Sequence, residues 1–159
     1  MKKLILFIVL ILGFINENKA QFAASSEIYY YLCVSNTGGA ANSSEIVKFY
    51  NNGVRHYTIF ESQYNEKSIN KAISEFEKKD WTYKSYDSDD STSSYVAYSK
   101  TYEDGSSTWL FFSKDKSEMI KVQFLKYTYV APLTVKRYYK RVTKQDLINK
   151  DKPNFDFLE

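Results

Sequence analysis

The stretch that decides the fold is residues 107–142, STWLFFSKDKSEMIKVQFLKYTYVAPLTVKRYYKRV. Aromatic and β-branched residues, which favour strands, dominate this stretch, and a polar run and one proline interrupt it. The sequence therefore predicts three consecutive strands, over residues 108–113, 119–130 and 133–142.

The second of these strands has a period of two. Three apolar residues alternate with two polar ones: Ile120, Val122 and Phe124 against Lys121 and Gln123. Because successive side chains of a strand point to opposite faces, this pattern predicts that the apolar residues face the core and the polar residues face solvent.

Two further β-rich runs, residues 46–50 and 54–60, flank Asn52-Gly53. An Asn-Gly pair is the strongest short signal for a hairpin, since both central residues of a type I′ turn need a positive φ. With this pair at the tip, the predicted partners across the hairpin are Phe49 with His56 and Val47 with Thr58.

One segment, residues 65–79, has the period of a helix. Its apolar residues recur at positions i, i+3, i+4 and i+7: Ile69, Ala72, Ile73 and Phe76. Asn65 can cap the first turn, and Glu66 lies where the helix dipole favours negative charge. This pattern predicts an amphipathic helix that packs on one face of a sheet.

Additional strands are predicted over residues 27–34, 81–86 and 95–102, and Thr143 opens a short helical turn. Period two places several large rings in the core: Trp81, Tyr83, Tyr98 and Phe124. The predicted fold is α+β, a predominantly antiparallel β-sheet of about seven to eight strands, strongly twisted or partly closed, with one amphipathic helix packed on it.

The first 20 residues have the layout of a signal peptide. Lys2 and Lys3 precede an apolar run, and a polar stretch leads to Ala20-Gln21. As a helix the apolar run spans about 18 Å, short of the roughly 30 Å of a bilayer core. We expect cleavage after residue 20, no membrane anchor in the mature chain, and export to the periplasm or beyond the cell. Residues 21–159 are expected to form a single Tyr-rich domain.

The composition excludes several classes of protein. With 43% hydrophobic residues, 5 glycines and 2 prolines, the chain is neither collagen-like nor of the Pro/Gly-rich disordered type. The net charge of +3 falls close to neutral without the leader, although the part after residue 113 is basic and the part before it acidic. Cys33, the only cysteine, cannot form an intramolecular disulfide and is expected to be buried.

Catalytic and cofactor patterns are missing from the sequence. His56 is the only histidine, so a zinc site of nitrogen and sulfur ligands is not expected, and neither a Walker loop nor a dinucleotide fingerprint occurs. The run Asp87, Asp89, Asp90 departs from a calcium loop at its sixth and twelfth positions. A carboxylate pair for glycoside hydrolysis stays open, because the separation of such a pair is set in three dimensions. We therefore expect that the protein is not an enzyme and that it binds no metal or cofactor.

The last predicted strand interleaves cations with aromatic rings. Its two faces carry the candidate binding residues, Lys136, Tyr138 and Lys140 on one side and Arg137 and Arg141 on the other. Such a face suits an acidic polysaccharide, a lipid head group or single-stranded nucleic acid, of which export disfavours the last. The alternative is that these cations protect an exposed sheet edge.

Aromatic residues make up 18% of the chain, including 15 tyrosines. Exposed rings on a sheet offer platforms for sugar rings, while buried rings simply suit strands. Runs such as Tyr29-Tyr30-Tyr31 must place rings on both faces of the sheet, so some of them lie outside the core.

The leader ending in Ala-Gln, the Tyr-rich opening strand, the stretch WLFFSKDKSEMIKV and the closing YYKRVTKQDL resemble a group of small exported proteins of Bacteroidota whose function is uncharacterised. The resemblance implies a compartment and no active-site residues. Asp90-Ser91-Thr92 also resembles the O-glycosylation sequon of exported proteins of that phylum, which makes Ser91 a candidate glycan acceptor.

Two hypotheses follow from the sequence. The first is an exported, non-enzymatic binding module that contacts a glycan or another envelope component through aromatic residues of the sheet. The second is an exported inhibitor or immunity-type protein that binds one partner protein, for which the uneven charge distribution is the motive.

Overall fold

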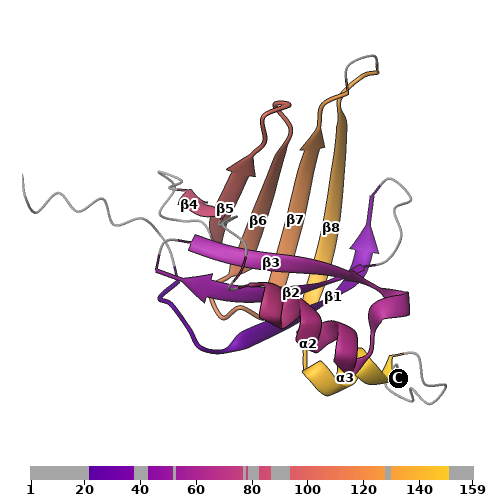
Figure 1. Cartoon of the computed structure of the whole chain (residues 1–159). Helices are drawn as coiled ribbons and strands as arrows, with labels where there is room; N and C mark the ends of the chain where they lie inside the picture. Colours follow the sequence, from indigo (N-terminus) through magenta and orange to yellow (C-terminus); the bar gives the residue numbers. More distant parts are fainter. Residues whose placement is uncertain are drawn as a thin grey trace, which may run out of the picture.

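The computed structural model describes residues 22–37, 43–51, 53–76, 78, 83–86, 94–127 and 130–150. The predicted signal peptide, Trp81 and the candidate acceptor Ser91 lie outside the described residues. The described chain has the predicted α+β fold, in which one antiparallel sheet curls into a half-barrel. Figure 1 shows the strands of residues 28–60 crossing in front of the taller strands of residues 95–142, with two helices below them.

In the part of the chain that the structure describes, the sheet has eight strands in the order β3-β2-β1-β8-β7-β6-β5-β4. Their bounds are β1 Ile28–Asn36, β2 Ser43–Tyr50, β3 Gly53–Phe60, β4 Lys84–Tyr86, β5 Tyr95–Thr101, β6 Ser107–Ser113, β7 Glu118–Leu125 and β8 Leu133–Val142. The other elements are the 3-10 turn η1 Glu61–Gln63, the helix α2 Glu66–Glu75 and the short helix α3 Lys144–Asn149.

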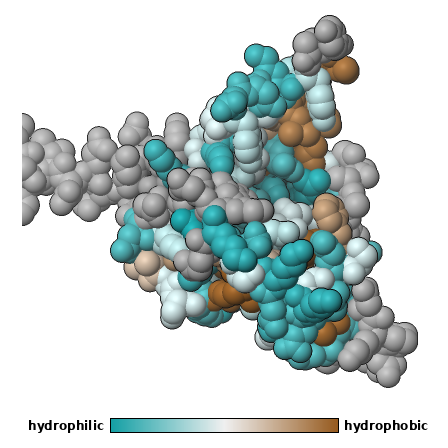
Figure 2. Space-filling model, viewed as in Figure 1, coloured by the Kyte–Doolittle hydropathy of each residue, from teal (hydrophilic) through white to brown (hydrophobic). Residues whose placement is uncertain are grey.

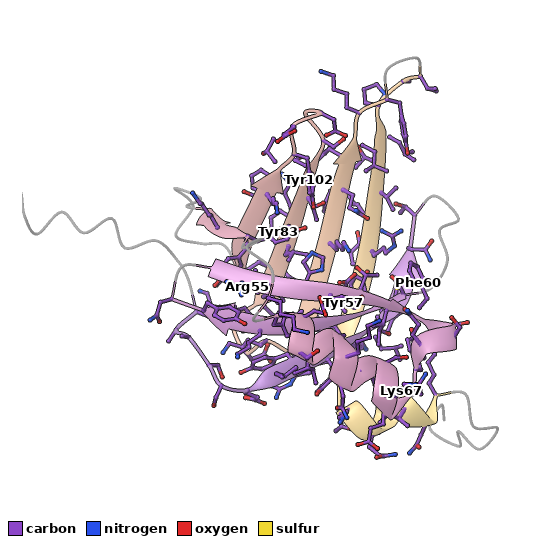
Figure 3. All side chains as sticks on the ribbon, in the orientation of Figure 1. Arg55, Tyr57, Phe60, Lys67, Tyr83 and Tyr102 are labelled. Carbon is purple, nitrogen blue, oxygen red and sulfur yellow. The ribbon has the colours of Figure 1, made fainter. Side chains whose placement is uncertain are left out.

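The two ends of the sheet meet at one point. Val54 at the start of β3 exchanges two backbone hydrogen bonds, of 2.9 and 2.8 Å, with Tyr83 just before β4. The Tyr83 hydroxyl also lies 2.7 Å from that of Tyr102, and in the view of Figure 3 both residues lie above β3, over the tall strands behind it. This contact curls the sheet and gives it an inner and an outer face.

The inner face is filled by a core in which aromatic rings dominate. Among its rings, Phe49 packs against Phe112 with centroids 5.1 Å apart, and Tyr98 packs against Phe112 at 5.9 Å. Cys33 is buried there, as predicted. The buried residues of this cluster are Tyr29, Tyr31, Cys33, Val47, Phe49, Val54, Tyr83, Val96, Tyr98, Leu110, Phe112, Met119 and Tyr139.

A lysine in the β6–β7 turn packs over the aromatic rings at one end of this core. The Lys116 ammonium lies 4.7 Å from the ring centre of Phe22, 5.0 Å from that of Phe49 and 5.1 Å from that of Tyr29. The lysine adopts a φ of 60°, a left-handed conformation that non-glycine residues rarely use. In this conformation the Lys116 ammonium is attracted to three aromatic rings by cation–π interactions, which offset the strain of the turn.

The outer face of β1–β3 is covered by the helices. Asn65 caps α2 as predicted, since its side chain accepts from the Ser68 N–H at 2.9 Å, and the helix ends at Glu75 instead of residue 79. Thr143 caps α3 by accepting from the Asp146 N–H. The buried residues between helices and sheet are Ile46, Ile59, Tyr64, Ile69, Ala72, Phe76 and Leu147. Figure 2 shows that α2 turns a hydrophilic surface to solvent.

The β2–β3 hairpin forms, but its predicted register is wrong by two residues. Tyr50 pairs with Gly53, so Val47 faces His56 and Phe49 faces Val54. Gly53, predicted at the tip of the turn, is therefore already the first strand residue, with a φ of 142°. A shift of two keeps each side chain on its predicted face, because the side-chain period of a strand is also two.

The predicted orientation of β7 is wrong. The register pairs Phe112 with Met119 and Leu110 with Lys121, so Met119 and Lys121 point to the inner face. Met119 is fully buried and Lys121 is 5% exposed, whereas Phe124, predicted in the core, is 45% exposed on the outer face. The alternation predicted the wrong face because both faces of β7 carry apolar side chains and because the charged Lys121 is buried on the inner face.

Candidate functional site

Strand β8 distributes the five candidate binding residues over both faces of the sheet, as its alternation predicted. Lys136, Tyr138 and Lys140 are exposed on the outer face. Arg137 and Arg141 lie on the side of the buried Tyr139. The five residues therefore do not form one site.

The two arginines are engaged within the fold. Arg137 Nη1 donates to Gln123 Oε1 at 2.5 Å. Arg141 Nη2 donates to Glu27 Oε1 at 2.5 Å, and its guanidinium lies 4.5 Å from the ring centre of Tyr29. These contacts tie β8 to β7 and to the start of β1, so we place neither arginine in the candidate surface.

The alternative explanation of the basic strand, protection of a sheet edge, is wrong. Strand β8 pairs with β1 on one side and with β7 on the other, so it lies in the middle of the sheet. Its outer cations therefore project from a continuous surface of paired strands.

That surface, the outer side of β5–β8, gathers aromatic side chains. Trp109 and Phe111 stack with their centroids 6.0 Å apart and their planes at 13°. A shallow groove of about 390 Å³ runs over the same strands, between Tyr95 and Tyr138. We call this region the outer aromatic face; its aromatic members are Tyr95, Trp109, Phe111, Phe124 and Tyr138.

Strand register arranges this face in cross-strand rows. One row runs from β4 to β8 through Lys84, Ser99, Trp109, Val122 and Lys136. The next runs from β5 to β8 through Ala97, Phe111, Ile120 and Tyr138. In Figure 1, β3 passes in front of β5–β8, and the outer aromatic face lies on the side of these strands that is turned away from β3.

Among the residues that the structure describes, no helix covers the outer aromatic face. Helix α2 contacts β2 and β3, and α3 contacts β1. Consequently Phe124 keeps 45% and Tyr138 39% of its surface exposed, while Ile46 and Ile59, on the same side of β2 and β3, are buried under the helices. Within the described residues, the helices thus cover the outer side of the sheet over β1–β3 and leave it open over β5–β8.

Three lysines project from the outer side of the described strands β4–β8: Lys84, Lys136 and Lys140. They are exposed and carry no ion pair to any residue that the structure describes. Glu118, which pairs with Lys140 across β7 and β8, is the single carboxylate in strands β4–β8 as described. The surface therefore has a net positive charge.

The inner face holds a buried charge network that the sequence did not predict. Lys121 Nζ donates to Glu45 Oε1 at 2.7 Å, and His56 Nδ1 lies 2.6 Å from Glu45 Oε2. The Thr58 hydroxyl donates to Glu45 at 2.9 Å and that of Tyr139 at 3.4 Å. Glu45 is completely buried, and Lys121 and His56 are nearly so.

The network keeps Glu45 ionised and His56 neutral. Burial by itself would raise the pKa of Glu45, but the Lys121 ammonium and the contact with His56 outweigh it and hold the pKa well below its ordinary value. Burial lowers the pKa of His56, against the opposing effect of the Glu45 carboxylate. Neutral His56 then donates its Nδ1–H to Glu45.

This arrangement neutralises a carboxylate inside the half-barrel. The other side of His56 packs against the Tyr83 ring, with centroids 4.8 Å apart. A buried carboxylate with an ammonium and three further donors is a structural link between β2, β3, β7 and β8. Glu45, His56 and Thr58 lie on one hairpin, but Lys121 and Tyr139 reach them only through the strand order, which no single segment of the sequence signals.

Among the described residues no group of three histidine, cysteine or acidic side chains is placed to hold a metal ion. Within the same residues no helix is long and apolar enough to span a bilayer. Comparison of the chain with protein-family models, with curated proteins and with solved structures found no match.

Proposed function

We propose that this protein is an exported, non-enzymatic binding module that holds a glycan on its outer aromatic face. The leader pattern of residues 1–20 supports export. The observation that carries the proposal is the outer side of the sheet, which the helices cover over β1–β3 and leave open over the aromatic strands β5–β8.

The chemistry of this face suits sugars. Pyranose rings present flat C–H surfaces that pack on aromatic rings, and their hydroxyls bond to polar groups at the rim. Tyr95 on β5 and Tyr138 on β8 line the groove with both a ring and a hydroxyl, and Phe111 comes from β6, which lies between these strands. The groove is open, so a chain of sugars can lie along it without entering a closed cavity.

A partner protein is the second candidate, and one observation favours it. Ile120 and Val122 form an aliphatic centre among the rings of the groove, and apolar centres with aromatic residues are typical of protein interfaces. An inhibitor or immunity-type protein would use the same face in this way.

A glycan array probed with the purified protein tests the proposal. We expect retention on a subset of glycans and a loss of about two- to tenfold in affinity for Tyr138→Ala and for Phe124→Ala, because each removes an exposed ring from the face. Phe60→Ala is the matched control, since Phe60 is 51% exposed at the end of β3, away from this face. Figure 3 shows its position.

Absence of retention on every glycan would overturn the proposal. Capture of one stoichiometric protein from the envelope, lost with Tyr138→Ala and kept with Phe60→Ala, would replace it with the partner-protein function. Equal losses for all three variants would show that the outer aromatic face is not the contact surface.

A further inference from the structure

We infer that the ligand of the outer aromatic face is an anionic glycan, whose acidic groups are held by Lys84 and Lys136 at the two ends of one cross-strand row. This inference rests on the proposed function and adds the chemical class of the ligand.

Lys84 and Lys136 lie at opposite ends of the row that passes through Ser99, Trp109 and Val122. Four strand spacings of about 4.8 Å separate them, so their Cα atoms are roughly 19 Å apart. An aromatic residue lies at the middle of the row and a cation at each end. A ligand that fits this row has apolar ring faces in its centre and negative charge at intervals along its length.

The charged residues on the other strands of this face also favour an anionic ligand. Lys140 lies on β8 two rows away from Lys136, about 13 Å along the strand. Glu118 is its partner across β7 and offsets part of its charge. Strands β5 and β6 carry Lys100 as their one charged residue, and it lies on the inner side with Tyr98. Lys84 and Lys136 therefore have no carboxylate beside them in strands β4–β8.

Some cations elsewhere in the described chain are paired with acids. Lys121 pairs with Glu45, Arg141 with Glu27 and Lys144 with Glu66. An exposed lysine without an acidic neighbour keeps its full charge for a ligand and attracts anions from solution. This charge complementarity favours a glycan with carboxylates over a neutral one.

Polygalacturonate and its methyl ester provide the test, because they share one sugar backbone and differ in charge. We expect the purified protein to bind polygalacturonate more tightly than the ester by about tenfold or more at low salt, with the difference shrinking as salt screens the charges. The double variant Lys84→Gln, Lys136→Gln should lose about two- to fivefold per lysine for the acidic polymer. It should leave binding of the ester unchanged.

Lys67→Gln is the control for net charge, because Lys67 is exposed on α2 and points away from the sheet in Figure 3. Equal binding of the two polymers, or equal effects of Lys67→Gln and the double variant, would overturn the anionic ligand and leave the glycan function in place. Failure to bind either polymer overturns the anionic inference for uronic acids. If the glycan array is also blank, the proposed function fails with it.

Discussion

The two sides of β7 and β8 carry the same kinds of residue and use them differently. On the inner side, Lys121 and Tyr139 are buried and both donate to Glu45. On the outer side, Lys136 and Tyr138 are exposed, and Lys136 has no ion pair within the described chain. Identical chemistry therefore stabilises the fold on one side and is free to meet a ligand on the other, a division that can be tested one substitution at a time.

The largest expected effect is at Lys121. Lys121→Met should lower the free energy of unfolding by about 3–5 kcal/mol, because it leaves the buried Glu45 carboxylate without its ammonium partner. Urea denaturation followed by circular dichroism measures the change. Lys136→Met, on the outer side of the neighbouring strand, is the matched control and should stay within about 0.5 kcal/mol of the parent.

A double substitution distinguishes a charge effect from a packing effect at this position. Glu45→Gln combined with Lys121→Met removes both charges, so it should be less destabilising than the sum of the single changes. If the two costs simply add, or if Lys121→Met has no effect on stability, the network does not hold the half-barrel together.

Patterns with a period of two residues for strands and 3.6 residues for helices predicted the elements of the fold well. Helix α2 with its Asn65 cap, the β2–β3 hairpin, and the strands of the stretch 107–142 all form. These features are local, because a cap, a turn or an alternation is written in neighbouring residues. The partial closure of the sheet was also expected.

The pattern failed where the answer depends on distant strands. Lys121 looks solvent-facing beside Ile120 and Val122, and only its juxtaposition with Glu45, 76 residues away, makes burial favourable. The two faces of β7 differ little in apolar content, so alternation alone does not choose the inner one. For the same reason the position of β8 in the middle of the sheet was missed, since strand order is not a local property.

The candidate site was predicted in part. The split of the β8 residues into two faces follows from alternation, and it placed Lys136, Tyr138 and Lys140 together. The engagement of Arg137 with Gln123 and of Arg141 with Glu27 depends on which strands and segments lie beside β8. Trp109 and Phe111 join the face because β6 aligns them with the outer row of β7.

An intermediate effect is expected from pH, and it belongs to the inner side alone. Burial lowers the pKa of His56 below its ordinary value of 6.5, so below that pH the unfolded chain binds a proton that the folded chain resists. Stability should therefore fall as the pH drops below about 6.5. Glu45, with its lowered pKa, adds a further loss below about pH 4.5.

Thermal unfolding between pH 7.5 and 5.5 measures this effect without interference, because His56 is the only histidine of the chain. We expect the midpoint temperature to drop over this range in the parent protein and to stay nearly constant in His56→Gln, whose amide can still donate to Glu45. A rise in the midpoint on acidification would mean that a charged His56 pairs with Glu45 in the folded protein.

The smallest expected effect is at Tyr138 on the outer side, and the adjacent Tyr139, on the inner side of the same strand, provides the sharpest comparison. Tyr139 is 1% exposed and Tyr138 is 39% exposed. Tyr139→Ala should cost about 3–5 kcal/mol, as truncation of a buried ring does, whereas Tyr138→Ala should cost about 1 kcal/mol or less, the range of strand preference. Chemical denaturation of the two variants in parallel measures the difference. A large loss at Tyr138 would show that the outer aromatic face packs within the molecule, and the glycan proposal would lose its free surface; a small loss leaves those rings exposed at little cost to the fold, which is the condition that a binding surface needs.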